Sequence, residues 1–370
     1  MSSRLSSRPS VAVWLLVLAL GACNAADRVA APSAERFGRP DIIVHPGTSI
    51  QAAIDAAAPG AVIRIEPGTY AEALTVSKPG IKLVGSPGKA GAVVIENPGD
   101  EEDGVTVTGA AAGFALVDVT VRGFEENGVV LTGVAGFLLS DVTAENDGEY
   151  GLFPVHSSHG VIERCSASGH SDTGIYVGQS QDVSVRHNVA FANVNGIEIE
   201  NSSDVKVIAN ETYDNVAGIL LVLLPGLDVK VSSGVLVSGN RVHDNNRPNF
   251  AAPGEIESAV PTGSGILIVG VDRALVEENT VTGNAFTGIA VGSTLLLGTL
   301  AGLPPEAFAD IEPNPDGARI RNNVATGNGA APSIPFLPGV DLLWDGSGVG
   351  NCWSANTFGS SAPPTLPTCG

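Results

Sequence analysis

The chain has 370 residues, with 39 acidic and 19 basic side chains and a formal net charge of −20. So acidic a surface argues against nucleic acid as a partner, because phosphate binding requires a basic stripe. It also counts against a long polyanionic substrate unless the local charge overrides it. The 46 glycines and the scarcity of aromatic residues, 5% of the chain, suit many short strands joined by tight bends.

Residues 1–22 are predicted to be an export signal. Two arginines precede an apolar run over residues 11–20, which is too short to span a bilayer. The Leu-Gly-Ala-Cys sequence that ends at Cys23 resembles the bacterial lipoprotein box. This resemblance implies that Cys23 is lipidated and is the only attachment to a membrane, and Asn24 implies the outer membrane. The alternative is an ordinary secretory signal, with Cys23 incidental. Residues 23–40, rich in Ala, Pro and Arg, are predicted to be a tether.

A short amphipathic helix is predicted next, with Thr48 or Ser49 as its N-cap and Pro59 as its stop. Its apolar stripe consists of Ile50, Ala53, Ile54 and Ala57. The helix leads into the alternating strand and turn AVIRIEPGTYAE. This arrangement resembles the N-terminal cap of right-handed parallel β-helices in the pectin lyase-like superfamily. Such a cap covers the sheet edge and core end that a first coil would otherwise expose.

Residues 174–215 contain one pattern twice, with a period of 22 residues. Each unit opens on a glycine, continues as an alternating strand and carries two asparagines near its end. The opening glycines are Gly128, Gly151, Gly174, Gly196, Gly218, Gly265 and Gly288. Residues one and three after each glycine point inward, and residues two and four point outward. So short a unit must stack on copies of itself, and its period of two excludes a pair of helices. With the resemblance of the cap, this predicts an all-β fold: a single-stranded, right-handed parallel β-helix over residues 41–351.

Polar residues are predicted to stack at two bends of each coil. The first series is Asp118, Asp141, Cys165, Asn188, Asn210, Asn240, Asn279 and Asn323. The second series is Gly123, Asn146, His170, Asn193, Asn215, Asn245, Asn284 and Asn328. Asparagines in register can hydrogen-bond along the stack, as amide ladders do in cross-β structures. Cys165 takes a place in the first series, so it is predicted to be a buried free thiol.

Four insertions are longer than the basic coil: residues 223–233, 246–264, 293–317 and 329–338. In a solenoid, extra residues leave as loops and need not disturb the core. The segments LLVLLPGLDV and LLLGTLAGLPP are unusually apolar for loops. They could cover one another, dock a protein partner or form a lid over a groove.

The candidate site is an outward strip on the coils of residues 150–201. Stacked coils bring equivalent outward residues to within about 4.8 Å of one another. The strip mixes aromatic, carboxylate, histidine and amide side chains, as carbohydrate sites do, because sugars offer a C–H face and a rim of hydroxyl groups. The candidate catalytic residues are Glu198, Glu200, Tyr176 and His156. The candidate substrate-binding residues are Phe153, Asp172, Gln179, Asn195 and Asn201.

Two kinds of chemistry fit these residues. Glu198 and Glu200 lie two residues apart on one face, so one could protonate a leaving group while the other activates water. Tyr176 or His156 could instead act as the acid or base of a lyase or epimerase. A purely structural or solubilising role is the alternative for each residue.

Residues 46 to about 350 look like the right-handed β-helix repeat proteins, which include pectate lyases, polygalacturonases and alginate epimerases. The segments EYGLFPVHSS, GHSDTGIYVGQS and GIEIENS resemble a group of bacterial β-helix repeat lipoproteins. The first also resembles the Tyr-Gly-Phe-Asp-Pro-His-Asp motif of mannuronan epimerases, which it matches at Tyr150, Gly151 and Pro154. Phe153 and Val155 stand at the first acid and the histidine of that motif. The resemblance implies a polysaccharide as the ligand.

No cofactor or metal is predicted. The acidic run at residues 100–103 is the one candidate for calcium, and a solvated turn is the favoured interpretation. Cys352 and Cys369 bracket the C-terminal segment, residues 352–370, and an oxidising compartment would let them form a disulfide.

Together these features predict an exported, lipid-anchored protein that binds and could modify a polysaccharide, by lyase, epimerase or hydrolase chemistry. The second hypothesis is a non-enzymatic cell-envelope protein that docks a protein partner through the same face or through its apolar loops.

Overall fold

The computed structural model describes residues 37–86 and 91–370. The predicted export signal, the lipidation site Cys23 and most of the tether therefore lie outside the described residues. None of the helices in the described part of the chain is long and apolar enough to cross a membrane.

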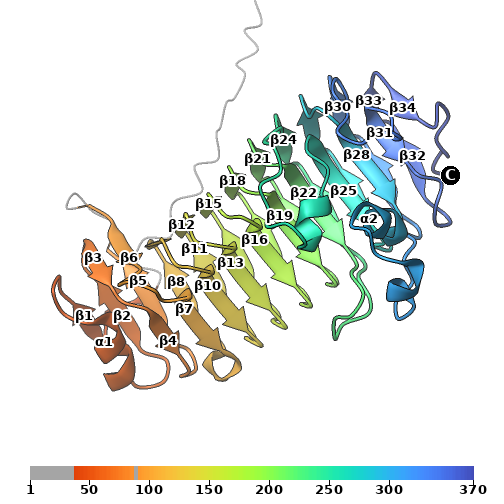
Figure 1. Cartoon of the computed structure of the whole chain (residues 1–370). Helices are drawn as coiled ribbons and strands as arrows, with labels where there is room; N and C mark the ends of the chain where they lie inside the picture. The colour runs from red at the N-terminus through yellow and green to blue at the C-terminus, as the bar shows by residue number, and fades with distance from the viewer. Residues whose placement is uncertain (1–36, 87–90) are drawn as a thin grey trace, which may run out of the picture. The chain divides into compact units, whose positions relative to one another are not determined.

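Three parallel sheets of 12, 11 and 11 strands run through the described residues, and successive coils add one strand to each (Figure 1). Sheet A contains β1 (Ile42–Val44), β2 (Val62–Ile65), β5 (Lys82–Gly85), β8 (Ala115–Val117), β11 (Leu138–Ser140), β14 (Val161–Glu163), β17 (Ser184–Arg186), β20 (Lys206–Ile208), β23 (Leu236–Ser238), β26 (Leu275–Glu277), β29 (Arg319–Arg321) and β32 (Cys352–Ser354). Sheet B contains β3 (Gly68–Ala71), β6 (Val93–Glu96), β9 (Thr120–Arg122), β12 (Thr143–Glu145), β15 (Ser166–Ser168), β18 (Val189–Phe191), β21 (Glu211–Tyr213), β24 (Arg241–His243), β27 (Thr280–Thr282), β30 (Val324–Thr326) and β33 (Thr357–Phe358). Sheet C contains β4 (Leu74–Val76), β7 (Asp103–Thr108), β10 (Asn127–Thr132), β13 (Tyr150–Val155), β16 (Thr173–Gly178), β19 (Asn195–Glu200), β22 (Ala217–Val222), β25 (Ser264–Val269), β28 (Thr287–Gly292), β31 (Val340–Trp344) and β34 (Ser361–Ala362). The predicted right-handed parallel β-helix is confirmed.

The predicted inward positions of sheet C form the core. Ile175 is paired in register with Ile197, which is paired with Ile219, and all three side chains are fully buried. The outward residue Leu220 belongs to a second, separate apolar cluster. Period-two patterning therefore separates the inner and outer faces as the sequence indicates.

The predicted asparagine stacks are confirmed as two continuous hydrogen-bond ladders. One follows sheet A at the bend into sheet B, and Asn188 Nδ2 donates to Asn210 Oδ1 at 2.9 Å. The other precedes sheet C, where Asn193 Nδ2 donates to Asn215 Oδ1 at 3.2 Å. Each Oδ1 also accepts the backbone N–H of the preceding asparagine. Both polar groups of every buried amide in these ladders are thereby used.

The first members of the two predicted series are one residue early. Val142, not Asp141, occupies the position of Cys165, because Thr143 pairs with Ser166. Asp147, not Asn146, occupies the position of His170, because Glu145 pairs with Ser168. Glu145 also pairs with Arg122, so the equivalent residue one coil earlier is Phe124, not the predicted Gly123. Asp141 and Asn146 instead have φ angles of 56° and 55° at the exposed side of each bend. The buried residue is the apolar Val142 in the first series, where its polar neighbour Asp141 was predicted instead, and the polar Asp147 in the second series, one residue after the predicted Asn146.

The sequence analysis missed a third ladder, made of serines at the bend from sheet C to sheet A. Ser157 N–H donates to Ser180 Oγ at 3.0 Å, and Ser180 N–H donates to Ser202 Oγ at 2.9 Å. Ser202 N–H continues the ladder to Ser232 Oγ. Every bend beside the candidate site is therefore held by side-chain hydrogen bonds.

At both ends of the solenoid, the capping helix and the disulfide agree with the predictions. The capping helix is α1 (Ile50–Ala56), whose N-cap Ser49 accepts a hydrogen bond from Ala52 N–H, and whose Ile50 and Ile54 are buried. At the other end, Cys352 and Cys369 form a disulfide. Cys165 is a buried free thiol, and burial raises its pKa to about 12.

The insertions fold back onto the outer face of sheet C. They contain the 3-10 helix η3 (Ile256–Ala259), α2 (Thr294–Leu300) and the 3-10 helix η4 (Pro305–Phe308). In Figure 1, α2 lies over the strands around β25 and β28. Leu220 and Leu267 of the sheet pack in one cluster with Val260 and Leu297 of the insertions. The apolar loops therefore mainly cover the solenoid itself, although Leu303 is 40% and Phe336 63% exposed.

Candidate functional site

Three aromatic side chains on the outer face of sheet C form a platform at the edge of the covered region. The Phe153 ring stacks on Tyr176, with centroids 4.7 Å apart and planes 23° from parallel. The Tyr150 ring lies 4.4 Å from Phe153 and 5.2 Å from Tyr176. Tyr150 and Phe153 remain partly exposed, whereas Tyr176 is buried. Register places Tyr176 directly beside Glu198 of the next coil.

Glu198 is a buried carboxyl with two hydrogen-bond donors. Thr173 Oγ1 donates to Glu198 Oε2 at 2.6 Å, and Asn195 Nδ2 donates to the same oxygen at 3.0 Å. Burial raises the pKa of Glu198 well above its usual range, and the charge of Asp172 adds to the shift. Only 2% of Glu198 is exposed, so its protonated form is the one that the folded protein favours.

Glu200 and Tyr176 form a hydrogen-bonded pair. Tyr176 Oη donates to Glu200 Oε1 at 2.7 Å. Burial raises the pKa of Glu200 to about 7, although the hydrogen bond from Tyr176 opposes the shift. Gly178 is paired with Glu200 in register, and a Cβ on Gly178 would overlap the Tyr176 hydroxyl. The tyrosine therefore reaches Glu200 across a glycine, and a carboxyl with a pKa near neutrality can both give and take a proton.

Two further carboxyls complete the cluster. The Thr173 hydroxyl also lies 2.8 Å from Asp172 Oδ1, and because it has one proton it donates to either Glu198 or Asp172. Asp172 is also hydrogen-bonded to Tyr150. Burial, together with the charge of Glu257, raises the pKa of Asp172 well above its usual range. Burial also raises the pKa of Glu257. Glu257 belongs to η3, so the insertion of residues 246–264 brings a fourth acid to the strands.

The remaining predicted residues lie at the carboxyl ends of the same strands, against the loop of residues 223–233. Gln179 Oε1 accepts hydrogen bonds from Asp228 N–H at 2.9 Å and Val229 N–H at 3.2 Å. Asn201 Nδ2 donates to the Val229 carbonyl at 2.6 Å. Asn201 is fully buried, so it contacts the loop and not solvent. His156 lies at the edge, 40% exposed, with Nε2 3.9 Å from Asp228 Oδ2.

The expected outward strip is present, but it is largely covered. Asp172, Tyr176, Glu198 and Glu200 are each at most 8% exposed, and Asn195 is fully buried. The insertions cover these side chains, and no local sequence pattern specifies that the insertions fold back onto sheet C. Tyr150, Thr173 and Glu257 also belong to the site and were not predicted as site residues. Only the motif resemblance indicates Tyr150 in the sequence. No sequence pattern indicates Glu257, because it comes from a distant loop.

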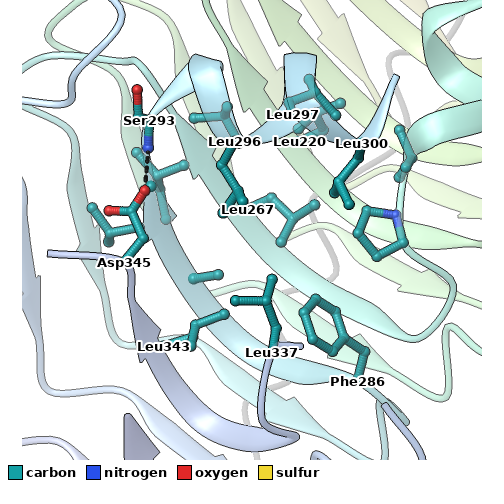
Figure 2. A pocket seen from close by; sticks show the side chains of 17 residues that line it. Leu220, Leu267, Phe286, Ser293, Leu296, Leu297, Leu300, Leu337, Leu343 and Asp345 are labelled. Atoms are coloured by element: carbon teal, nitrogen blue, oxygen red, sulfur yellow. Dashed lines mark hydrogen bonds between the residues drawn. The ribbon is translucent and has the colours of Figure 1, made fainter. Parts of the chain in front are cut away.

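An apolar cavity of about 60 Å³ lies beside the cluster, between sheet C, α2 and the insertion of residues 329–338. Figure 2 shows leucines of these elements, with Phe286, directed toward one another, and the Ser293 N–H donating to Asp345 Oδ2 at the rim. A smaller cavity of about 10 Å³ lies next to it and is lined by Asn195, Glu198 and Glu257 together with six apolar residues of sheet C and the insertions. The two cavities share lining residues, so the acidic cluster borders an apolar interior. Among residues 37–86 and 91–370, no group of three or more His, Cys, Asp or Glu is arranged to hold a metal ion.

Comparison with known protein families places the chain among right-handed β-helix proteins. The family model described as "Right handed beta helix region" matches residues 91–224 and 127–297, which together span more than half of the chain. The chain belongs to this family. A comparison with curated protein sequences finds no significant match.

Solved structures share the fold at low sequence identity. The A-module of the mannuronan C-5 epimerase AlgE4 from Azotobacter vinelandii is 18% identical, with a TM-score of 0.57 over 86% of this chain and 97% of that chain. The periplasmic alginate epimerase AlgG is 15% identical, with a TM-score of 0.53 over 86% and 84%. A GH136 lacto-N-biosidase from Eubacterium ramulus is 12% identical, with a TM-score of 0.53 over 85% and 67%. These similarities establish the fold, and each of these neighbours is named for an activity on a carbohydrate.

Proposed function

We propose that this protein binds a polysaccharide on the outer face of sheet C and modifies it by proton transfer at the acidic cluster. The observation that carries the proposal is the Tyr176–Glu200 pair beside an aromatic platform. A carboxyl whose pKa is about 7 is suited to general acid–base catalysis near neutral pH. The carbohydrate-active neighbours on the same fold support this choice of ligand.

Each group has a role in this proposal. Tyr150 and Phe153 present ring faces and edges to the C–H face of a sugar. Glu200 exchanges a proton with the substrate, and Tyr176 orients that carboxyl by its hydrogen bond. Glu198, held by Thr173, stays protonated and donates a hydrogen bond to a sugar oxygen. The insertion that carries Glu257 must move to admit the substrate, since the cluster is covered.

Glu200→Gln is expected to lower the rate of product formation about 100-fold, because it removes the proton carrier and keeps the shape of the side chain. Tyr176→Phe and Gly178→Ala should also slow the reaction, because each removes or displaces the hydroxyl that holds Glu200. The purified protein would be incubated with neutral, cationic and uronate oligosaccharides, and products followed by mass spectrometry, ultraviolet absorbance and NMR. These readouts separate hydrolysis, elimination and epimerisation.

The matched control is Glu306→Gln, in which an exposed glutamate on η4 is replaced. This variant should retain full activity. Full activity of Glu200→Gln on a substrate that the unaltered protein converts would exclude Glu200 as the proton carrier. Absence of both binding and turnover across the panel would contradict the proposed function as a whole.

We also propose that the protein is exported and anchored through a lipid on Cys23, on the basis of the lipoprotein-box resemblance at the N-terminal segment. Cys23→Ser should abolish incorporation of labelled palmitate and move the protein from the membrane fraction to the soluble periplasmic fraction. A control variant, Cys165→Ser, alters a buried thiol elsewhere in the chain and should keep the label. Unchanged membrane association of Cys23→Ser would contradict the anchor.

A further inference from the structure

A row of acidic residues, one in each of four successive coils, leads to the candidate site. Successive coils are joined by backbone hydrogen bonds from Glu126 N–H to the Glu102 carbonyl, from Glu149 N–H to the Glu126 carbonyl and from Asp172 N–H to the Glu149 carbonyl. The row therefore runs Glu102, Glu126, Glu149, Asp172 along the amino edge of sheet C, with the backbones of successive residues one coil apart, about 4.8 Å. Burial and the neighbouring acids raise the pKa of Glu126.

No basic side chain balances this charge within the described part of the site. The hydrogen bonds to Asp172, Glu198 and Glu200 come from Thr173, Asn195 and the two tyrosines. His156 pairs with Asp228 at the opposite end of the strands. A polyuronate would therefore meet like charges along the whole row, which is repulsive.

The row ends at an unpartnered acceptor. Asn195 follows Asp172 in the next coil, since Asn195 N–H donates to the Asp172 carbonyl at 2.8 Å. Asn195 is fully buried, and its Oδ1 has no hydrogen-bond partner, although its Nδ2 donates to Glu198. Leaving a buried acceptor without a hydrogen bond costs about 1–3 kcal/mol of stability, so a ligand group that donates to Asn195 Oδ1 would bind favourably. Asn195 lines the small cavity together with Glu198 and Glu257.

A second unpartnered acceptor lies earlier along the same edge. Asn127 is 8% exposed, and its Oδ1 is also without a partner, while its Nδ2 donates to Asp103 Oδ1 at 2.7 Å. Register pairs Asn127 with Tyr150 of the platform. Acceptors that lack donors thus occur on both sides of the aromatic platform, and both lie beside carboxyls.

The size of the small cavity restricts the group that could enter it. About 10 Å³ accommodates one group the size of a water molecule, which excludes a sugar ring. An ammonium group has that size, carries three N–H donors and no acceptor, and attracts carboxylates. A hydroxyl group has one donor and no positive charge, so it cannot favour the ionised form of these carboxyls as an ammonium group does.

From this arrangement we infer that the site binds a polymer of amino sugars with free amino groups, one of which enters the cavity and donates to Asn195 Oδ1, Glu198 and Glu257. The inference rests on the proposed function and specifies its substrate class. The sugar ring lies against Tyr150 and Phe153, and further amino groups follow the acidic row. A repeated positive charge on the polymer complements the carboxyls of the four coils in the row.

The test compares glucosamine oligomers with N-acetylglucosamine oligomers of equal length, at a mildly acidic pH where the amines are protonated. Isothermal titration calorimetry with the purified protein should show at least about tenfold tighter binding of the glucosamine oligomer, the equivalent of one charge-assisted hydrogen bond. Glu257→Gln and Asn195→Leu should each remove about tenfold of that preference. Glu257 lies on an insertion outside the solenoid core, so this variant stays informative if Asn195→Leu fails to fold.

The control Glu306→Gln should keep the preference, since this glutamate is exposed on η4. Oligolysine of equal charge should bind at least about tenfold more weakly than the glucosamine oligomer, because it has no sugar face for the aromatic platform. Equal binding of oligolysine would overturn the inference in favour of general cation attraction. Preference for N-acetylated or uronate oligomers, with or without calcium, would overturn it and leave the proposed function standing.

Discussion

Replacing Asn210 by alanine is expected to lower the free energy of unfolding by about 3 kcal/mol. Asn210 Oδ1 accepts the backbone N–H of Asn188 at 3.0 Å, and Asn210 Nδ2 donates to the Val185 carbonyl at 3.0 Å. Asn210 is 1% exposed, so water cannot replace these partners. Alanine leaves the Asn188 N–H buried without an acceptor, which alone costs about 1–3 kcal/mol. The lost volume adds a small cavity to that cost.

The measurement is urea unfolding followed by far-ultraviolet circular dichroism, with amide hydrogen exchange as a local readout at Asn188. Asn314→Ala is the matched control, because Asn314 is an asparagine whose hydrogen bonds to Glu312 are exposed. Its free energy of unfolding should change by less than about 0.5 kcal/mol. If Asn210→Ala costs no more than the control, the ladder is not a main source of stability.

The ladders matter for function because they fix the register of the strands that carry the site. Asn193, one of the ladder residues, lies two residues before β19. With these bends held, Tyr176 is paired with Glu198, and Gly178 is paired with Glu200. A shift of one residue would turn the carboxyls into the core and the isoleucines outward. The bends therefore hold the strands that carry the hydrogen-bonded pair of Tyr176 and Glu200 in register.

The scaffold could be predicted from the sequence because its rules are local. Period-two patterning places Ile197 and Ile199 inside and Glu198 and Glu200 outside, and the structure confirms this. The asparagine stacks follow from spacing alone. They fail in the coil that carries Val142 and Asp147. At its first bend the buried residue is the apolar Val142, and at its second bend it is Asp147, one residue after the predicted Asn146. The serine ladder escaped notice because serine is common at any turn.

The burial and the protonation of the site residues could not be predicted, because both depend on contacts between distant segments. Glu257 reaches the strands from an insertion that begins more than 45 residues after Glu200. No pattern within that insertion shows which face of the solenoid it covers. Burial raises the pKa of Glu198, and three insertions contribute residues to the cavity beside it, so the electrostatics of the site follow from tertiary packing. Sequence identified the carboxyls, and the fold determines their protonation.

Asp147→Asn is expected to raise the free energy of unfolding by about 4 kcal/mol near pH 7.5. Asp147 is 1% exposed, its Oδ1 accepts Phe124 N–H at 3.1 Å, and its Oδ2 has no partner. Burial raises the pKa of Asp147 to about 8, far above the value of about 3.9 in an unfolded chain. For an acid shifted upward, stability is greatest below the unfolded pKa and is lost as the pH rises toward the folded pKa. Asparagine removes that loss, so the gain should shrink to near zero at about pH 4.

His170→Asn, at the next position of the same ladder, should show the opposite dependence. His170 is fully buried, and burial lowers its pKa to about 4 from an unfolded value of about 6.5. A lowered pKa on a base makes the native state lose stability as the pH falls below the unfolded value, so the asparagine variant should gain about 2.5 kcal/mol at about pH 4.5 and little at pH 7.5.

Asparagine also suits the position, because His170 N–H already donates to Asn193 Oδ1 and the Ala144 carbonyl lies where a ladder amide donates. The same substitution at exposed His187 is the control, since no desolvation accompanies an exposed ring. Urea unfolding at both pH values is the measurement. If the free energies of unfolding of Asp147→Asn and His170→Asn change in parallel with pH, the two buried groups do not carry the charge states inferred for them. If they change in opposite directions, this bend has a pH dependence that the asparagine coils lack.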